Sequence, residues 1–234
     1  MSDPDPVFSP SPGKTALSLF YILLFLIAAQ VTGLIVKYGF GHGWLFGLVP
    51  LFNFNTEQNI PTLYNTILLL LNSGLLFLVR RSPGTATGPR WVWLLLSVVF
   101  LILAMDEFCE IHEKLSAPFH SKFDTTGLLY YAWVIPYGII SLLLLLFFIP
   151  VWWKLERKIR FLFALAAILY FSGSIVFEML GGRVFEQLGD QLSLKGGILA
   201  TFEESLEMGG LIILSYGLML LLVRKSGSFS IRIS

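Results

Sequence analysis

Three short segments of this sequence are rich in acidic side chains. They read LAMDEFCEIHEKL, SIVFEMLGG and TFEESLEMGG, and their candidate ligands are Asp106, Glu107, Glu110, His112, Glu113, Glu178, Glu203, Glu204 and Glu207. Carboxylates, with or without an imidazole, are the ligands that Mg, Ca, Mn and non-haem Fe take in proteins. The three segments therefore indicate a site for a divalent cation of this group.

Two other arrangements would also account for so many carboxylates. Glu113, Glu203 and Glu204 would be solvated at wet helix ends, while Asp106 and Glu107 pair with Arg183 or Lys114. Alternatively, the acidic side chains would line a path for protons or ions. An isolated charge inside an apolar span costs about 2.5–3.5 kcal/mol, so each arrangement must supply partners or water.

Two familiar metal motifs are absent from the acidic segments. The string HEKLS has serine where a zinc protease helix needs its second histidine. The residue three positions before His112 is Cys109, whereas a ferritin-like dimetal site needs glutamate there. Cys109 is the single cysteine and is interpreted as a small packing residue rather than a nucleophile.

The elements that carry these segments are apolar and long enough to cross a bilayer. The chain is 56% hydrophobic and only 13% charged, and a span needs about 20 residues. Six spans are expected, at Thr15–Lys37, Ile60–Val79, Trp91–Leu115, Gly127–Trp153, Ile159–Leu180 and Leu199–Val223. The predicted fold is an all-α polytopic helical bundle over residues 14–225, with a disordered tail at 1–13 and a short tail at 226–234.

The third span predicts a particular arrangement of its carboxylates. Nothing in its sequence breaks a helix before Pro118, so one continuous helix is expected. At about 100° per residue, Asp106, Glu110 and Glu113 would share one face with Glu107 at its edge, and His112 would point elsewhere.

Basic residues predict the orientation of the spans. Arg80, Arg81 and Arg90 occupy one short loop, and Lys154, Arg157, Lys158 and Arg160 another, which places both loops and both termini in the cytoplasm. A rise of about 1.5 Å per residue then puts the acidic residues in one layer, roughly 22–30 Å from the cytoplasmic boundary. That layer faces the outer side.

The remaining polar residues of the spans indicate helix ends and helix contacts. A natural helix start is formed by Glu57, Gln58 and Asn59 before Pro61, and capping is their expected role. Asn65 and Asn72 lie on one face and are expected to hydrogen-bond across helices. Close helix contacts are expected at four small residues, Gly173, Ser174, Gly209 and Gly210.

The middle third of the chain resembles a widespread group of uncharacterised bacterial multipass membrane proteins. The resemblance lies in FNFNTEQNIPTLYNTILLLLNSGLLFLV, in LAMDEFCEIHEKL and in EESLEMGG. It implies the bacterial inner membrane and carries over Asp106, Glu107, His112 and Glu113 as motif residues. Glu110 stands where the group tends to have small residues.

Three functions fit these observations. The first is a membrane enzyme on a lipid or amphiphile, whose metal is held by Asp106, Glu107 and Glu207 and activates water. The second is an ion or proton transporter, although the inner half of the spans has few polar residues. The third is a non-catalytic subunit or assembly factor of a membrane complex. A net charge of +1 gives no field for nucleic acid, so the expected partners are membrane lipids, with a complex partner or a second copy also compatible.

Overall fold

A computed structural model describes residues 7–8, 11–82, 84–190, 192–226 and 231–232. Within this part of the chain, six helical segments are long and apolar enough to cross a membrane. They comprise α1 (Pro12–Phe40), α3 (Ile60–Arg81), α4 (Arg90–Cys109), α6 (Val134–Trp152), α7 (Arg157–Phe171) continuing through a π-helical turn (Ser172–Phe177) into α8 (Glu178–Leu188), and α9 (Leu194–Ser226). The predicted class, an all-α bundle with six candidate spans, is confirmed.

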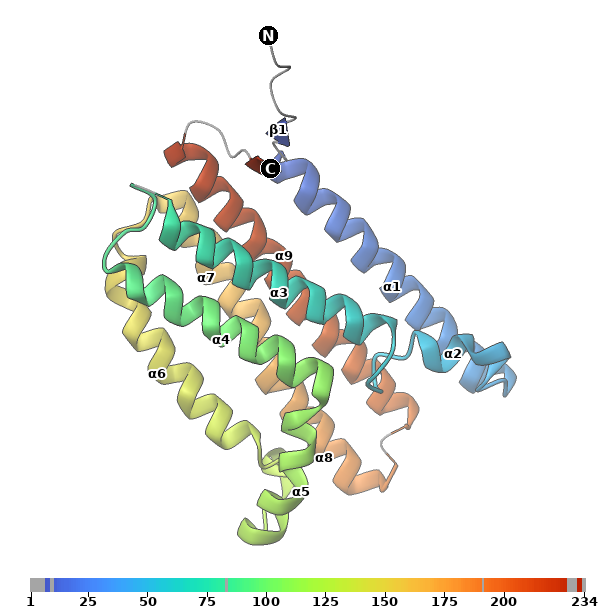
Figure 1. Ribbon diagram of the computed structural model, residues 1–234. Helices are drawn as coiled ribbons and strands as arrows, with labels where there is room; N and C mark the ends of the chain where they lie inside the picture. The colour runs from blue at the N-terminus through green and yellow to red at the C-terminus, as the bar shows by residue number, and fades with distance from the viewer. Residues whose placement is uncertain (1–6, 9–10, 83, 191, 227–230, 233–234) are drawn as a thin grey trace.

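Shorter elements connect these helices. They are a 3₁₀ turn (Leu45–Gly47), α2 (Leu48–Leu51), α5 (Ile111–Phe123), a second 3₁₀ turn (Gly127–Leu129) and the two-residue strands β1 (Val7–Phe8) and β2 (Ile231–Arg232). The two strands pair antiparallel and so lie side by side (Figure 1). The predicted N-terminal and C-terminal tails fall largely outside the described residues.

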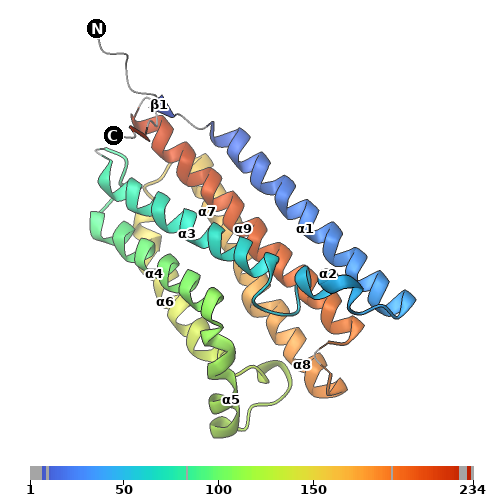
Figure 2. The ribbon, with the colours of Figure 1, turned by 45° about the vertical axis from the view of Figure 1, so that its right-hand side comes forward.

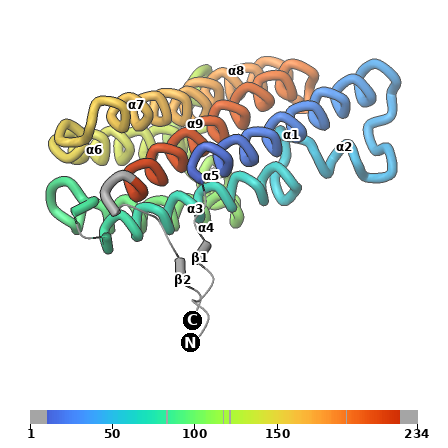
Figure 3. Tube along the Cα trace, turned by 90° about the horizontal axis from the view of Figure 1, so that it is seen from above, coloured from blue at the N-terminus to red at the C-terminus, as the bar shows by residue number. Residues whose placement is uncertain are grey.

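Helices α3 and α9 form the centre of the bundle. Each has 61% of its most apolar window buried, compared with 17% for α1 and 11% for α6. Helix α9 packs between α3 and α7, α4 packs on α3, and α1 lies along α9 (Figures 2 and 3). Most side chains of α1 and α6 therefore point away from the protein, as lipid-facing residues do.

Polar side chains join the central helices, as the sequence predicts. Asn72 Nδ2 donates to the carbonyl of Leu211 at 3.1 Å, which links α3 to α9. Ser73 and Ser97 each donate to the other's carbonyl, at 2.7 and 2.9 Å, and link α3 to α4. These bonds satisfy hydroxyl and amide groups that lipid would leave unpaired.

The loop before α3 is tied to the bundle by side-chain hydrogen bonds. The backbone N–H of Phe54 donates to Gln30 Oε1 of α1 at 3.3 Å. Asn59 Oδ1 accepts from the N–H of Thr62 at 3.1 Å and caps α3, which confirms the predicted cap. The loop residues between them, including Glu57, are thereby held at the end of α3.

The predicted continuous third helix is wrong. Helix α4 ends at Cys109, and Glu110 has the left-handed conformation φ 55°, ψ 42° before α5 begins. The carboxylate of Asp106 accepts the N–H of His112 at 2.8 Å, so a side chain stabilises the break by satisfying a donor in the first turn of α5. Pro118 lies inside α5 rather than ending a helix.

The π-helical turn between α7 and α8 brings α9 very close. A Cβ built on Gly173 would lie 2.6 Å from the carbonyl oxygen of Glu203 and 2.8 Å from Glu207 Cγ. A Cβ on Gly210 would lie 2.8 Å from the carbonyl oxygen of Ala166. These two predicted contacts are confirmed, whereas Gly209 faces open space.

Candidate functional site

One cavity brings the acidic segments together. Its volume is about 720 Å³, and its wall includes residues of α4, α5, α8 and α9. Eight of the nine candidate residues line it, namely Asp106, Glu107, His112, Glu113, Glu178, Glu203, Glu204 and Glu207. The ninth, Glu110, does not line the cavity and instead lies 4.0 Å from Lys114 Nζ. The helix break explains this difference, because it rotates α5 relative to α4.

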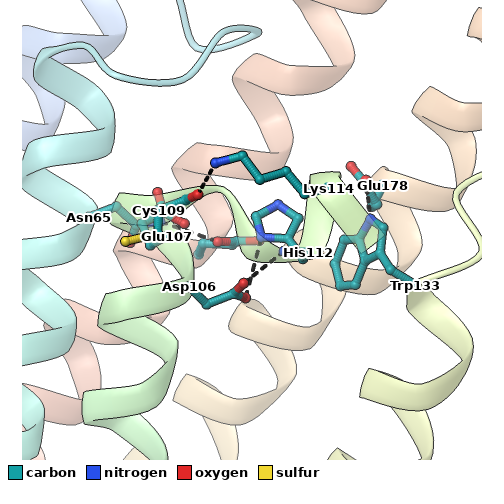
Figure 4. Close-up of polar contacts among 9 residues, drawn as sticks. Asn65, Asp106, Glu107, Cys109, His112, Lys114, Trp133 and Glu178 are labelled. Carbon is teal, nitrogen blue, oxygen red and sulfur yellow. Dashed lines mark hydrogen bonds and ion pairs between the residues drawn. The ribbon is translucent and has the colours of Figure 1, made fainter. Parts of the chain in front are cut away.

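Asp106 and His112 form a pair at the break. His112 Nδ1 lies 3.3 Å from Asp106 Oδ2, while the other oxygen of Asp106 accepts the backbone N–H of His112 (Figure 4). Tyr137 of α6 also hydrogen-bonds to Asp106. The expectation that His112 points away from the carboxylates is therefore wrong.

Asn65 holds two carboxylates from different helices. Its side-chain N–H group donates to Glu107 Oε1 at 3.1 Å and to Glu207 Oε2 at 3.4 Å. Asn65 is fully buried, whereas Lys114 is exposed and donates to the carbonyl of Cys109. The hydrogen-bond partner of Glu107 is thus the side-chain amide of Asn65, and Lys114 does not neutralise the carboxylate of Glu107.

Glu178 connects the cluster to the N-terminal end of α6. The indole N–H of Trp133 donates to Glu178 Oε1 at 3.1 Å (Figure 4). Glu178 also hydrogen-bonds to Glu203. Glu178 thus links α8 to the N-terminal end of α6 and to Glu203 of α9.

Glu57 is a member of the cluster that the sequence interpretation assigned to helix capping. Its Oε2 accepts from Thr62 Oγ1 at 3.1 Å, and its side chain lines the cavity. Burial, together with the charge of Glu113, raises the pKa of Glu57 from 4.5 to about 7. The sequence feature that could have identified Glu57 is its position two residues before the Asn59 cap. This position places Glu57 at the same depth as the acidic layer.

The α5 residues of the cluster also have altered acidity. Burial lowers the pKa of His112, but the hydrogen bond and charge of Asp106 outweigh burial and raise it from 6.5 to about 9. Burial, with the charge of Glu178, raises the pKa of Glu113. His112 is therefore a proton donor at neutral pH, while Glu57 titrates near neutrality.

The cavity changes character along its length. Beyond the carboxylates it continues between α4, α6, α7 and α9, where apolar side chains form its wall, including Leu96, Leu144, Phe148, Trp152, Phe163 and Leu214. Trp152 is the last residue of α6 and Phe163 belongs to the first half of α7. The cavity thus runs from the acidic layer towards the opposite end of the bundle.

The carboxylates are not arranged as a metal cage. Within the described residues, no group of three or more His, Cys, Asp or Glu side chains is close enough to hold a metal ion. Two buried acceptor atoms of the cluster, Glu204 Oε2 and Asn65 Oδ1, have no hydrogen-bond partner in the structure. The cluster therefore contains hydrogen-bond acceptors without partners, but its described residues do not form a ready set of metal ligands.

The fold and the site are those of a multipass helical membrane protein whose bundle contains a cavity with an acidic and an apolar part. Residues 18–222 match a family model, and the chain belongs to the family described as "Domain of unknown function (DUF8692)". No curated protein and no solved structure matches the chain. The function must therefore be argued from the site itself.

Proposed function

We propose that this chain is a membrane enzyme that binds an amphiphile in the cavity and acts on its polar head at the carboxylate and histidine cluster. The observation that carries the proposal is the single cavity that joins an acidic end to an apolar end. Its volume of about 720 Å³ is within the usual range for small-molecule sites, roughly 300–1,000 Å³. A lipid-like molecule has the same division into polar head and apolar chain.

The cluster contains groups suited to proton transfer at that head. His112, oriented by Asp106 at 3.3 Å, has a pKa of about 9 and can donate a proton. Glu57 has a pKa of about 7 and can accept one at neutral pH. Two titratable groups with separated pKa values supply the acid and the base that hydrolysis of an ester or amide needs.

The divalent cation remains a separate part of this proposal. In that version, Glu107, Glu204 and Glu207 rearrange to bind the metal, and Glu204 Oε2 is available because it has no partner. A metal would polarise the bond to be cleaved and lower the pKa of its water. The lack of a preformed ligand set in the described residues means that the site would have to close around the ion.

The cavity favours this function over the other two hypotheses. A transport path for ions would need polar groups along its length, whereas the far end of the cavity has an apolar wall, for example at Leu76, Phe148 and Phe163. A purely structural subunit gives no reason for a cavity that contacts every acidic segment.

Filling the apolar part of the cavity should remove a bound amphiphile. Ser141 lines the cavity, whereas Leu142 beside it is 57% exposed and does not. We expect Ser141→Trp to lower the amount of amphiphile that co-purifies with the protein by about tenfold, the effect of losing about 1.4 kcal/mol of binding. Mass spectrometry of extracts from equal amounts of protein measures this amount.

Leu142→Trp is the matched control and should retain the wild-type amount. Equal loss from both variants, or no specific amphiphile in the wild type, would contradict the proposed function. Metal analysis of the same preparations tests the cation separately. Stoichiometric divalent metal in the wild type that is lost from Glu107→Gln and Glu207→Gln would support the bound cation. Absence of metal from the wild type would leave proton transfer as the only proposed chemistry of the site.

The orientation of the site is also a proposal, supported by the positive-inside pattern of the loops. We propose that the acidic end faces the outer side of a bacterial inner membrane. In a Cys109→Ser background, a membrane-impermeant thiol reagent added outside should label Lys122→Cys and should leave Ser82→Cys unlabelled. Labelling of Ser82→Cys alone would show that the acidic end faces the cytoplasm.

A further inference from the structure

The carboxyl groups at the acidic end of the cavity far outnumber the basic side chains that could balance them. Among the described residues that line it there is no lysine or arginine, and His112 is its one imidazole. The carboxyl groups in its wall are those of Glu57, Asp106, Glu107, Glu113, Glu178, Asp190, Glu203, Glu204 and Glu207. So many carboxylates in a low-dielectric place favour a ligand that brings positive charge.

We propose that the polar head of the bound amphiphile is an organic cation, a primary or quaternary ammonium group. This inference rests on the proposed function and names the class of its ligand. The apolar part of the cavity receives the chain, and the carboxylates neutralise the head. Three further features of the cavity support a cationic head.

The first support is the kind of polar atom that lacks a partner. Glu204 lines the cavity, and its Oε2 is buried and has no hydrogen-bond partner. A carboxylate oxygen is an acceptor. A buried acceptor without a partner costs free energy, and a donor or a cation in the ligand removes that cost.

The second support is a group of aromatic rings beside the carboxylates. Trp133 and Tyr137 both line the cavity, and their ring centroids lie 5.1 Å apart at an interplanar angle of 82°. The bond from Trp133 to Glu178 fixes the indole ring next to a carboxylate. Tyr131 lines the same end of the cavity. Aromatic faces together with carboxylates are the surroundings that ammonium groups prefer.

The third support is that anionic heads fit this cavity less well than a cation does. A phosphate or sulfate head needs arginine, lysine or several backbone N–H donors, and the described lining residues include neither basic side chain. A phosphate held through a divalent metal would need a ligand set, and no group of three suitable side chains exists in the described residues. An organic cation requires neither of these.

The test compares ligands that share one chain and differ in the head. Radiolabelled hexadecyltrimethylammonium, hexadecanol and hexadecyl phosphate are bound to the full chain in dodecyl maltoside micelles, with and without added Mn²⁺. We expect the ammonium ligand to bind about tenfold more tightly than the alcohol, which corresponds to about 1.4 kcal/mol.

Glu204→Gln should remove this preference and still bind the alcohol, which shows that the cavity is folded. Glu186→Gln alters an exposed carboxylate outside the cavity and should bind all ligands as the wild type does.

The outcomes separate this inference from the proposed function. Equal and saturable binding of the ammonium ligand and the alcohol overturns the cationic head and leaves the amphiphile site. Tight binding of the phosphate that depends on Mn²⁺ overturns the cationic head in favour of a metal. No saturable binding of any ligand, with no amphiphile co-purified from the membrane, overturns both.

Discussion

Replacing Gly173 with alanine is expected to lower the free energy of unfolding by about 1–3 kcal/mol, the usual cost of forcing a group into a filled space. The new Cβ would lie 2.6 Å from the carbonyl oxygen of Glu203. That atom belongs to the backbone of α9, so the two helices must separate. Because Glu203 and Glu207 line the cavity next to this contact, the variant should also lose amphiphile.

Gly209 supplies the matched control because a Cβ there meets nothing within 4 Å. Alanine is a better helix former than glycine by up to about 1 kcal/mol, so Gly209→Ala should be neutral or stabilising. Both substitutions add the same methyl group, and only Gly173→Ala should lower the free energy of unfolding. Reversible unfolding in mixed micelles measures the free energy of unfolding of both variants. Equal effects at the two positions would show that α9 leaves room for a methyl group at Gly173.

Much of the bundle could be predicted because lipid imposes simple rules on sequence. A span must be apolar for about 20 residues, and its polar groups must find partners inside the protein. Asn72 illustrates the second rule, because its bond to the carbonyl of Leu211 follows from its type and position. The same reasoning placed Asn65 correctly as a residue that bonds across helices, here to Glu107 and Glu207.

The geometry of the third helix could not be predicted from helical periodicity. Glu110 adopts φ 55°, which is uncommon for a residue other than glycine, and neither glycine nor proline marks the break. The break is stabilised by the backbone N–H of His112, which donates to the carboxylate of Asp106. Such a local bond competes with the helix, and only its combination with the packing of α5 decides the outcome. As a result, the sequence interpretation exchanged the roles of Glu110 and His112.

Glu57 shows a second limit of sequence reasoning. It lies outside every span, next to a residue that caps a helix, and a capping role explained it fully. Its place in the cluster depends on the fold of the loop, which the bond from Phe54 to Gln30 fixes from α1. A contact between residues 24 positions apart leaves no periodic signal in the sequence.

The second large effect that we expect is a loss of stability as the pH rises from about 6.5 to 9, caused by the pair of Asp106 and His112. The pKa of His112 is raised from 6.5 to about 9 in the folded protein, so between these values the folded state binds a proton that the unfolded state has released. The stabilisation is fully present below pH 6.5 and is lost as the pH rises through 9. A shift of this size corresponds to roughly 3 kcal/mol, at about 1.4 kcal/mol per pKa unit.

Asp106→Asn tests the pair because asparagine can still accept the backbone N–H of His112 but carries no charge. Removal of the Asp106 charge removes the largest effects that raise the pKa of His112, so this pKa should fall and the loss of stability between pH 6.5 and 9 should shrink by up to about 3 kcal/mol. Glu57, whose pKa is raised to about 7, destabilises the folded protein as the pH rises between 4.5 and 7, and both proteins retain it. The difference between their unfolding curves from pH 6 to 10 therefore reports the pair. Glu110→Gln changes a carboxylate outside the cavity and should give a curve of stability against pH that is parallel to that of the wild type. If the curve of Asp106→Asn were also parallel to the wild-type curve, Asp106 would not set the charge of His112.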